Sequence, residues 1–210
     1  MVTAPVRFTQ ALELAERHLA DLPYRQLAVE HEASGERLEP EFRRDGWTAD
    51  REVVMALERP ADRDVDTSVV GELTAEEALP LMRRWSAEDP RLELSEEDLR
   101  QIAEFSRRSW EARSARCLGV RDERGAPVAL TALYSDGATA QVEDVYVVPE
   151  QRGHGFGRAL VTRALAIARG DGHEFTFIVA DDAGWPKNLY ARLGFVPVGR
   201  NWLFHRDRAR

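Results

Sequence analysis

The sequence predicts a mixed α/β fold, in which helices flank a mostly antiparallel central sheet and a smaller α/β half-domain precedes it. Three observations support this prediction. Two helical segments in the middle of the chain are followed by alternating apolar strands that hairpin turns connect. A glycine-rich junction at residues 147–160 then joins a strand to an amphipathic helix. The first 64 residues show a helix–strand–helix–strand order of their own.

The larger domain is predicted to span residues 65–210. Capping boxes, each a Ser or Thr followed three residues later by an acidic residue, mark helix starts at residues 74 and 95. Gly125 and Gly137 lie in typical hairpin turns. The predicted elements in order are a strand (68–73), helices (75–85 and 96–112), strands (115–122, 127–135 and 139–148), a helix (156–169), a strand (174–180) and a closing helix that begins near residue 186.

The smaller domain is predicted to span residues 1–64 and to repeat the end of the larger one. Its predicted elements are a helix (9–22), a strand (24–31), a helix (36–44) and a strand (52–59). At an offset of 148 residues this order matches the end of the chain without a gap, which is typical of a degenerate internal repeat. The copy has Phe42 where the end of the chain has Tyr190, and it lacks the glycine-rich junction. An unrelated α/β extension is the alternative interpretation.

The junction at residues 147–160 is the most informative segment of the chain. Three alternate glycines carry no Cβ there: Gly153, Gly155 and Gly157. A diphosphate can therefore approach the backbone closely, and the start of the helix presents free N–H groups and the positive end of its dipole. Polar and cationic side chains accompany the glycines: Gln151, Arg152 and Arg158. The segment predicts a phosphate-binding loop, with a tight turn as the structural alternative.

Two common phosphate-binding loops do not fit this spacing. A P-loop requires lysine after the last glycine, but Gly157 is followed by arginine. A dinucleotide-binding G-x-G-x-x-G pattern fails in both registers, because Arg158 ends the pattern that begins at Gly153 and Leu160 ends the one that begins at Gly155.

The pattern Arg-x-x-Gly-x-Gly at residues 152–157, after a strand that ends in Val-Pro, resembles the acyl-CoA-binding motif of the GNAT N-acetyltransferase superfamily. The pattern Leu-Tyr-x-x-Leu-Gly-Phe at residues 189–195 resembles the closing helix and turn of the same superfamily. This resemblance implies the acyl-CoA N-acyltransferase fold for the larger domain, with acetyl-CoA as co-substrate. It implies cofactor contacts from Val145, Val147, Gln151, Arg152, Gly153, His154, Gly155, Phe156, Gly157 and Arg158.

The catalytic candidates are one tyrosine and two carboxylates. The resemblance places Tyr190 where the superfamily has the tyrosine that protonates the departing thiolate; a core position is the alternative. Glu143 and Asp144, on the strand before the loop, are candidates for the base that deprotonates an amine. Successive strand residues face opposite sides, so at most one should face the cleft unless a bulge intervenes, and we favour Glu143. Alternatively, both are solvated or ion-paired. A backbone N–H near Val147 is expected to polarise the thioester oxygen.

Composition narrows the functional classes further. The formal charge of −8 argues against general affinity for nucleic acid or anionic membranes. Apolar runs fall short of the roughly 18 residues of a membrane span, and the N-terminus lacks the pattern of a signal peptide, so a cytoplasmic location is expected. Cys117 is the only cysteine and the five histidines are scattered, which predicts neither an internal disulfide nor a metal site.

The sequence therefore predicts an acetyl-CoA-dependent N-acetyltransferase. It would transfer an acetyl group by direct attack of a primary amine that belongs to a small molecule or a peptide. Three alternatives stay open: a longer acyl-CoA donor, a hydroxyl acceptor, and a non-catalytic acyl-CoA-binding module. A homodimer is a further alternative for the assembly.

Overall fold

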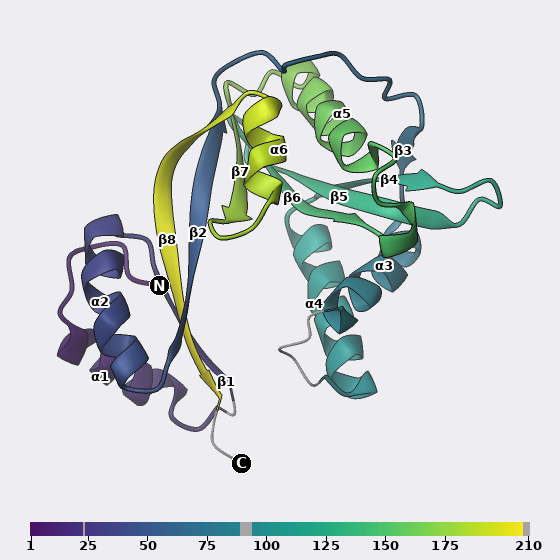
Figure 1. Cartoon of the computed structure of the whole chain (residues 1–210). Helices are drawn as coiled ribbons and strands as arrows, with labels where there is room; N and C mark the ends of the chain where they lie inside the picture. Colours follow the sequence, from purple (N-terminus) through teal and green to yellow (C-terminus); the bar gives the residue numbers. More distant parts are fainter. Residues whose placement is uncertain (23, 89–93, 208–210) are drawn as a thin grey trace. The chain divides into compact units, whose positions relative to one another are not determined.

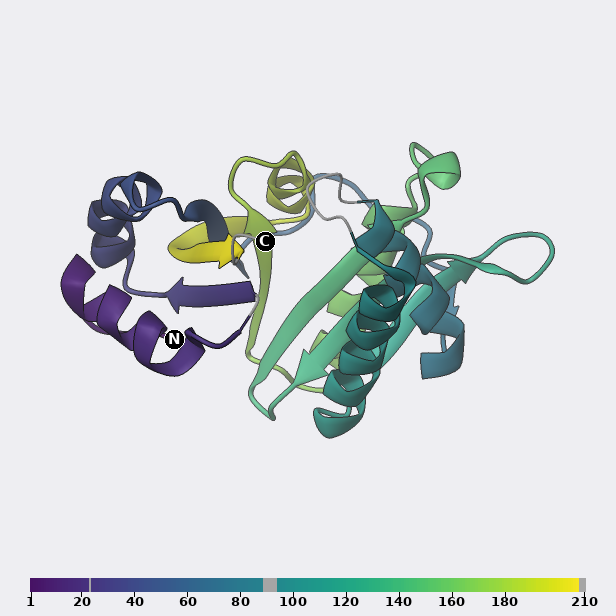
Figure 2. The same cartoon turned by 90° about the horizontal axis from the view of Figure 1, so that it is seen from below.

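The computed structural model describes residues 1–22, 24–88 and 94–207 (Figures 1 and 2). The chain divides into two compact units. The first unit comprises Met1–Met55, Val179–Ala191 and Val196–Arg210. The second unit comprises Ala56–Ile178 and Arg192–Phe195.

The second unit contains a mixed sheet with helices on both faces. Its strands lie in the order β7-β6-β5-β4-β3, and β6 and β7 are the parallel pair, whereas β3–β4, β4–β5 and β5–β6 are antiparallel. Helices α3 and α4 cover one face and α5 covers the other (Figures 1 and 2). The elements are β3 (Val70–Glu72), α3 (Ala75–Ala87), α4 (Glu96–Ala112), β4 (Arg116–Arg121), β5 (Pro127–Ser135), β6 (Thr139–Val147), α5 (Phe156–Gly170) and β7 (Phe175–Asp181), the last three residues of β7 belonging to the first unit. This arrangement confirms the predicted mixed, mostly antiparallel α/β fold.

The two predicted capping boxes begin α3 and α4. The backbone N–H of Thr74 donates to Glu77 at 2.8 Å, and that of Glu77 donates to the Thr74 hydroxyl at 3.3 Å. Ser95 and Asp98 make the same reciprocal bonds at 2.9 and 3.2 Å. Each box satisfies two backbone donors that a helix start leaves without a partner. Short-range signals of this kind explain why both helix starts could be predicted.

The first unit packs two helices against strands from both ends of the chain. Strand β1 pairs with β8 antiparallel, from Tyr24 opposite Asp207 to Val29 opposite Trp202. Its elements are α1 (Phe8–Leu19), β1 (Tyr24–Val29), α2 (Glu32–Arg44), β2 (Thr48–Leu57), α6 (Pro186–Arg192) and β8 (Phe195–Asp207). The last residues of β2 and α6 and the first residue of β8 belong to the second unit. Figure 1 shows α1 and α2 beside β1 and β8.

Aromatic rings form the core of the first unit. The Phe42 ring stacks on Phe204 with 4.3 Å between centroids and meets the edges of Phe8 and Trp47 at 5.0 and 5.3 Å. Trp202 fills the space beside Gly35, where an added Cβ would lie 2.3 Å from the indole. Residues from the N-terminal segment and from β8 therefore share one core.

Two predicted boundaries in the N-terminal segment were wrong. Helix α2 begins at Glu32 rather than at residue 36, because His31 acts as its N-cap and its Nδ1 accepts from the Ser34 backbone N–H at 3.2 Å. Histidine is not among the usual capping residues, so this start carries no common signal. Strand β2 begins at Thr48 rather than at residue 52. The order α1-β1-α2-β2 matches α5-β7-α6-β8, and the division into domains 1–64 and 65–210 stays a prediction.

Substituting Gly194 by alanine is expected to destabilise the protein by at least about 2 kcal/mol, because strained backbone and overpacking each cost about 1–3 kcal/mol. Gly194 has φ +102°, and an added Cβ would lie 1.9 Å from the Arg59 carbonyl oxygen. Gly172→Ala is the matched control, since Gly172 has φ +84° but open space around it. Chemical denaturation measures both. Equal losses in the two variants would contradict the role of the close approach.

Candidate active site

The glycine loop, residues 149–158, joins β6 to α5 and has the geometry of an anion site. A short 3-10 turn (Pro149–Gln151) precedes Gly153 and Gly155, which have φ +86° and +83°. Gly155 is the N-cap of α5, and its carbonyl accepts from the Ala159 N–H at 3.0 Å. The N–H groups of the three residues between them have no acceptor within an α-helix. Apart from their chain neighbours and the adjoining helix backbone, no atom of the described residues lies within 4 Å of a Cβ built at Gly153 or Gly155, so their outer side is open.

The side chains of the glycine loop are held by local bonds. Arg152 donates from Nε to the Val147 carbonyl at 3.0 Å and from Nη2 to Glu88 at 2.7 Å. The Nδ1 of His154 lies 3.1 Å from the Gln151 carbonyl oxygen. Its ring stacks beside that of Phe156, with centroids 5.9 Å apart. These contacts keep the cation of Arg152 at the end of β6, next to the loop.

Arg158 has a different environment from the one the sequence indicates. Its side chain is 6% exposed, and Nη1 lies 2.6 Å from Oδ1 of Asp62 in the stretch before β3. The carboxylate balances the guanidinium charge, so the side chain is engaged inside the second unit. The contribution of Arg158 to an anion site would then come from its backbone N–H, in the first turn of α5.

Strand β6 offers backbone donors on the side that faces away from β5. It pairs with β7 over Thr139–Val142, and the recorded pairing ends there. The Val148 N–H donates to Val128 on β5 at 3.0 Å. Because N–H groups alternate sides along a strand, those of Val147 and Val145 point away from β5. Backbone N–H groups without a strand partner are the kind of donor that stabilises a developing oxyanion in acyl transfer.

A bulge in β6 brings both candidate carboxylates to one cavity. The pairing with β5 steps from Leu130 opposite Tyr146 to Ala132 opposite Glu143, so β6 carries one extra residue there. Asp144 lies in this bulge with φ +56°, a left-handed conformation that is uncommon for residues other than glycine. The Thr131 hydroxyl donates to the Glu143 carbonyl at 2.7 Å beside it. The exception that the sequence allowed for, a bulge that redirects a side chain, is thus present.

The cavity has a volume of about 220 Å³ and lies in the second unit. Glu143 and Asp144 line it together with residues of α4 and its C-cap, β5 and β6: Phe105, Ser106, Ser109, Trp110, Arg113, Tyr134 and Gln141. Trp110 Nε1 donates to Asp144 Oδ2 at 3.2 Å, and Gln141 donates to Glu143. Both carboxylates are therefore oriented by neighbours within the cavity.

The pKa of Asp144 is shifted by its surroundings. Burial raises the pKa of Asp144 above its ordinary value, and the Trp110 hydrogen bond offsets part of this effect. Burial and the charge of Asp144 also raise the pKa of the Cys117 thiol to about 12. A carboxylate with a raised pKa is a better proton acceptor near neutral pH than an ordinary one. Its place in the cavity, its hydrogen bond from Trp110 and its raised pKa make Asp144 a candidate base, and Glu143, the residue favoured from sequence, lines the same cavity.

Asp144→Asn is expected to stabilise the protein at neutral pH. Because the pKa of Asp144 is raised on folding, the folded state binds more protons between the unfolded and folded values, and wild-type stability falls as the pH rises through that window. Asparagine keeps an oxygen for Trp110 and does not ionise. The gain should therefore be present at pH 7 and shrink toward zero near about pH 3.5, below the ordinary aspartate pKa of about 3.9. Denaturant unfolding at several pH values measures it; a less stable variant at pH 7 would contradict the effect of burial.

Tyr190 lies in α6, within the first unit, and its side chain is 5% exposed. The other predicted site residues belong to the second unit. The structure thus groups the glycine loop with Glu143 and Asp144 in one unit, and Tyr190 belongs to the other. Its catalytic role stays a prediction.

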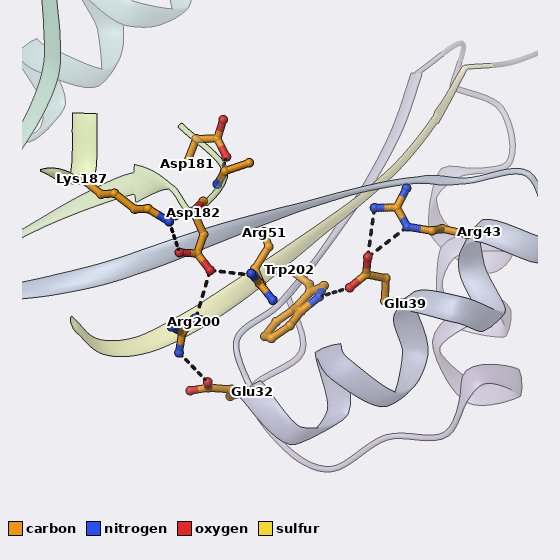
Figure 3. A network of polar contacts seen from close by, with 10 residues as sticks. Glu32, Glu39, Arg43, Arg51, Asp181, Asp182, Lys187, Arg200 and Trp202 are labelled. Atoms are coloured by element: carbon orange, nitrogen blue, oxygen red, sulfur yellow. Dashed lines mark hydrogen bonds and ion pairs between the residues drawn. The ribbon is translucent and has the colours of Figure 1, made fainter. Parts of the chain in front are cut away.

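A polar network around Asp182 fixes the start of α6 (Figure 3). Asp182 is 7% exposed and accepts from three cations: Arg51 at 2.7 Å, Lys187 at 2.9 Å and Arg200 at 3.1 Å. Hydrogen bonding from Lys187, with Arg200 and Arg51, lowers the pKa of Asp182 despite its burial. Lys187 lies in the first turn of α6, so the network connects the helix that carries Tyr190 to β2 and β8.

The same part of the first unit anchors Trp202. Its Nε1 donates to Glu39 at 3.0 Å, and Glu39 also pairs with Arg43 (Figure 3). Arg200 reaches Glu32 at 3.2 Å. Helix α2 thus contributes two carboxylates to side chains of β8, which makes the N-terminal segment an integral part of this unit.

Sequence reasoning missed part of the cavity wall. Arg113 and Tyr134 come from the end of α4 and from β5, and they carry no motif. The capping box predicted where α4 begins, but it gave no reason to expect a cavity beside that helix. The bulge at Asp144 was also invisible, because it consists of one residue without a partner in the facing strand.

Comparisons with known proteins agree on the fold. The model of the acetyltransferase (GNAT) family matches residues 79–195. A functionally unknown conserved protein from Staphylococcus epidermidis is similar, with a TM-score of 0.71 and 18% identity, covering 99% of this chain and 83% of that one. A GCN5-related N-acetyltransferase from Kribbella flavida has a TM-score of 0.62 and 19% identity, covering 100% and 79%.

A tandem GNAT protein from the clavulanic acid biosynthesis pathway has a TM-score of 0.63 and 19% identity, covering 97% of this chain and 69% of that one. No curated protein matches the sequence. No helix in the described part of the chain is both long and apolar enough to cross a bilayer. Within residues 1–22, 24–88 and 94–207, no three His, Cys, Asp or Glu side chains are grouped as metal ligands would be.

Proposed function

Because the chain belongs to the acetyltransferase (GNAT) family, we propose that it transfers an acetyl group from acetyl-CoA to the primary amine of a small-molecule or peptide acceptor. The family uses acetyl-CoA as co-substrate, which supplies an activated thioester. One observation carries the proposal: a loop with the geometry of a diphosphate site follows directly on a bulged strand that places two carboxylates in a cavity.

The glycine loop fits the charged part of acetyl-CoA. Free N–H groups at the start of α5, two glycines with an open outer side and the nearby cation of Arg152 form the donor set that a diphosphate needs. The backbone N–H groups of Val145 and Val147 would polarise the thioester carbonyl oxygen. Removing one such donor from an enzyme typically costs about 10²–10³ in rate.

Proton transfer assigns roles to the remaining candidates. An ammonium acceptor loses two protons on its way to the amide, and Asp144 takes the first before the nitrogen attacks the carbonyl carbon. The carbon–sulfur bond then breaks, and Tyr190 donates a proton to the thiolate. The second nitrogen proton leaves to solvent, Asp144 releases its proton to solvent, and Tyr190 is reprotonated from solvent. General acid–base catalysis of this type contributes typically about 10²–10⁴-fold.

We also propose that the N-terminal segment is a degenerate GNAT half-domain without a cofactor site of its own. The supporting observations are the element order α1-β1-α2-β2 and the similarity to a tandem GNAT protein. A cytoplasmic location and a homodimer belong to this proposal as well.

The function is tested by following thiol release from acetyl-CoA with a panel of primary amines and their hydroxyl counterparts, with mass spectrometry of the products. We expect an acetylated amine and a matching amount of free CoA. Faster reaction with a longer acyl-CoA, or acetylation of hydroxyls in preference to amines, would replace the proposed donor or acceptor. If the protein binds CoA tightly but acetylates no acceptor, the alternative of a non-catalytic acyl-CoA-binding module would replace the proposed enzyme.

A further inference from the structure

The cavity beside Asp144 carries opposite charges on two of its walls. Glu143 and Asp144 lie on β6, and Arg113 lies at the end of α4. The guanidinium carbon of Arg113 is 5.5 Å from the ring centroid of Tyr134, another lining residue. No described residue forms an ion pair with Arg113, although two carboxylates line the same cavity. The lining of the cavity thus includes one cation and two carboxylates.

The size and the remaining walls limit what this cavity can accept. At about 220 Å³ it is smaller than the roughly 300–1,000 Å³ of pockets for drug-sized ligands. Three aromatic side chains contribute to its lining: Phe105, Trp110 and Tyr134. Phe105 is 72% exposed, an unusual exposure for a phenylalanine ring, and it offers an apolar surface at the cavity. A ligand with an apolar body about the size of one amino acid would suit these walls.

We propose that this cavity binds the acceptor and that the acceptor is a free amino acid with an apolar side chain. The proposal rests on the acetyltransferase function above and specifies its substrate. The ammonium group lies against Glu143 and Asp144, where the base is needed. The carboxylate binds the guanidinium of Arg113, whose planar fork matches a carboxylate with two parallel hydrogen bonds. The side chain packs against Phe105 and Tyr134.

Other amines fit this charge pattern less well. A diamine would bring its second cation toward Arg113, and like charges in a small cavity repel each other. A simple alkylamine would cover the guanidinium of Arg113 without offering it an anion, so that the cation would lose water and gain no ion pair. A peptide N-terminus presents a neutral amide in place of the carboxylate. These acceptors are the alternative outcomes of the experiment.

The experiment compares amino acids with the amines that lack their carboxylate. The probes are L-phenylalanine with 2-phenylethylamine, and L-leucine with 3-methylbutylamine, together with cadaverine. We expect the wild-type enzyme to prefer each amino acid in kcat/KM. In Arg113→Ala the KM for the amino acid should rise by about 10–100-fold, the scale of a hydrogen-bonded charge pair, and the amino acid to amine ratio should fall accordingly. Arg113→Glu should invert the preference.

Arg108→Ala is the matched control. Arg108 lies on the same helix and pairs with Glu104 at 2.8 Å, and it does not line the cavity, so its loss should leave the ratio unchanged. Thermal unfolding verifies that all variants are folded. Wild-type enzyme that acetylates cadaverine or the simple amines in preference to the amino acids, or a ratio insensitive to Arg113, would overturn this inference and leave the acetyltransferase function standing. If no amine in any panel is acetylated, the proposed function itself fails.

Discussion

Gly155→Val is expected to abolish the binding of coenzyme A while the chain still folds. Gly155 caps α5 with φ +83°, a conformation that a β-branched residue adopts only under strain. No protein atom lies within 4 Å of a Cβ at this position, so the valine side chain would project into the space where a diphosphate must approach. Isothermal titration calorimetry with CoA measures the loss of binding, and thermal unfolding measures the cost of the strain.

Gly125→Val separates these two effects. Gly125 lies in the turn between β4 and β5 with φ +82°, and a Cβ there also meets no protein atom within 4 Å. The control variant therefore carries the same backbone strain, about 1–3 kcal/mol, at a site outside the glycine loop. It should lose stability to a similar extent and bind CoA normally. Normal CoA binding by Gly155→Val would instead show that the anion site lies elsewhere.

Much of the second unit could be predicted because its signals are short-range. The capping boxes at Thr74 and Ser95 and the turn at Gly125 act over three to five residues. The glycine loop could be located for the same reason, since its glycines and the start of α5 are neighbours in the sequence. Predictions of this kind depend on local backbone chemistry, which one sequence displays directly.

Features that depend on distant partners could not be predicted. The pairing of β1 with β8 joins residues near 24–29 to residues near 202–207, and no local pattern specifies it. The direction of the Asp144 side chain depends on one extra residue in β6 relative to β5. The sequence indicated that the Arg158 side chain is a cation of the glycine loop, but this side chain pairs with Asp62. The pair could not be predicted, because Asp62 lies 96 residues away in the sequence.

Tyr190→Phe is expected to lower kcat by about 10–10³-fold, the scale of a lost general acid whose role water can partly take over. Tyr190 is 5% exposed in α6, and phenylalanine keeps the buried ring, so the loss of packing should be small. Binding of acetyl-CoA should be unchanged, since the diphosphate contacts belong to the glycine loop. Steady-state kinetics with an acetylated amine, with chemistry shown to be rate-limiting, measures the effect.

The leaving group distinguishes a general acid from a structural tyrosine. If Tyr190 protonates the thiolate, the loss in Tyr190→Phe should shrink for acyl donors whose thiol has a lower pKa, because such a thiolate departs without a proton. A structural role would lower the rate equally for all donors. Tyr24→Phe is the control and should leave kcat unchanged, because Tyr24 is 44% exposed at the start of β1 in the same unit. A wild-type kcat in Tyr190→Phe would contradict the role of Tyr190 as general acid. Tyr190 would then be a core residue of α6, a helix whose first turn the Lys187–Asp182 ion pair holds in place.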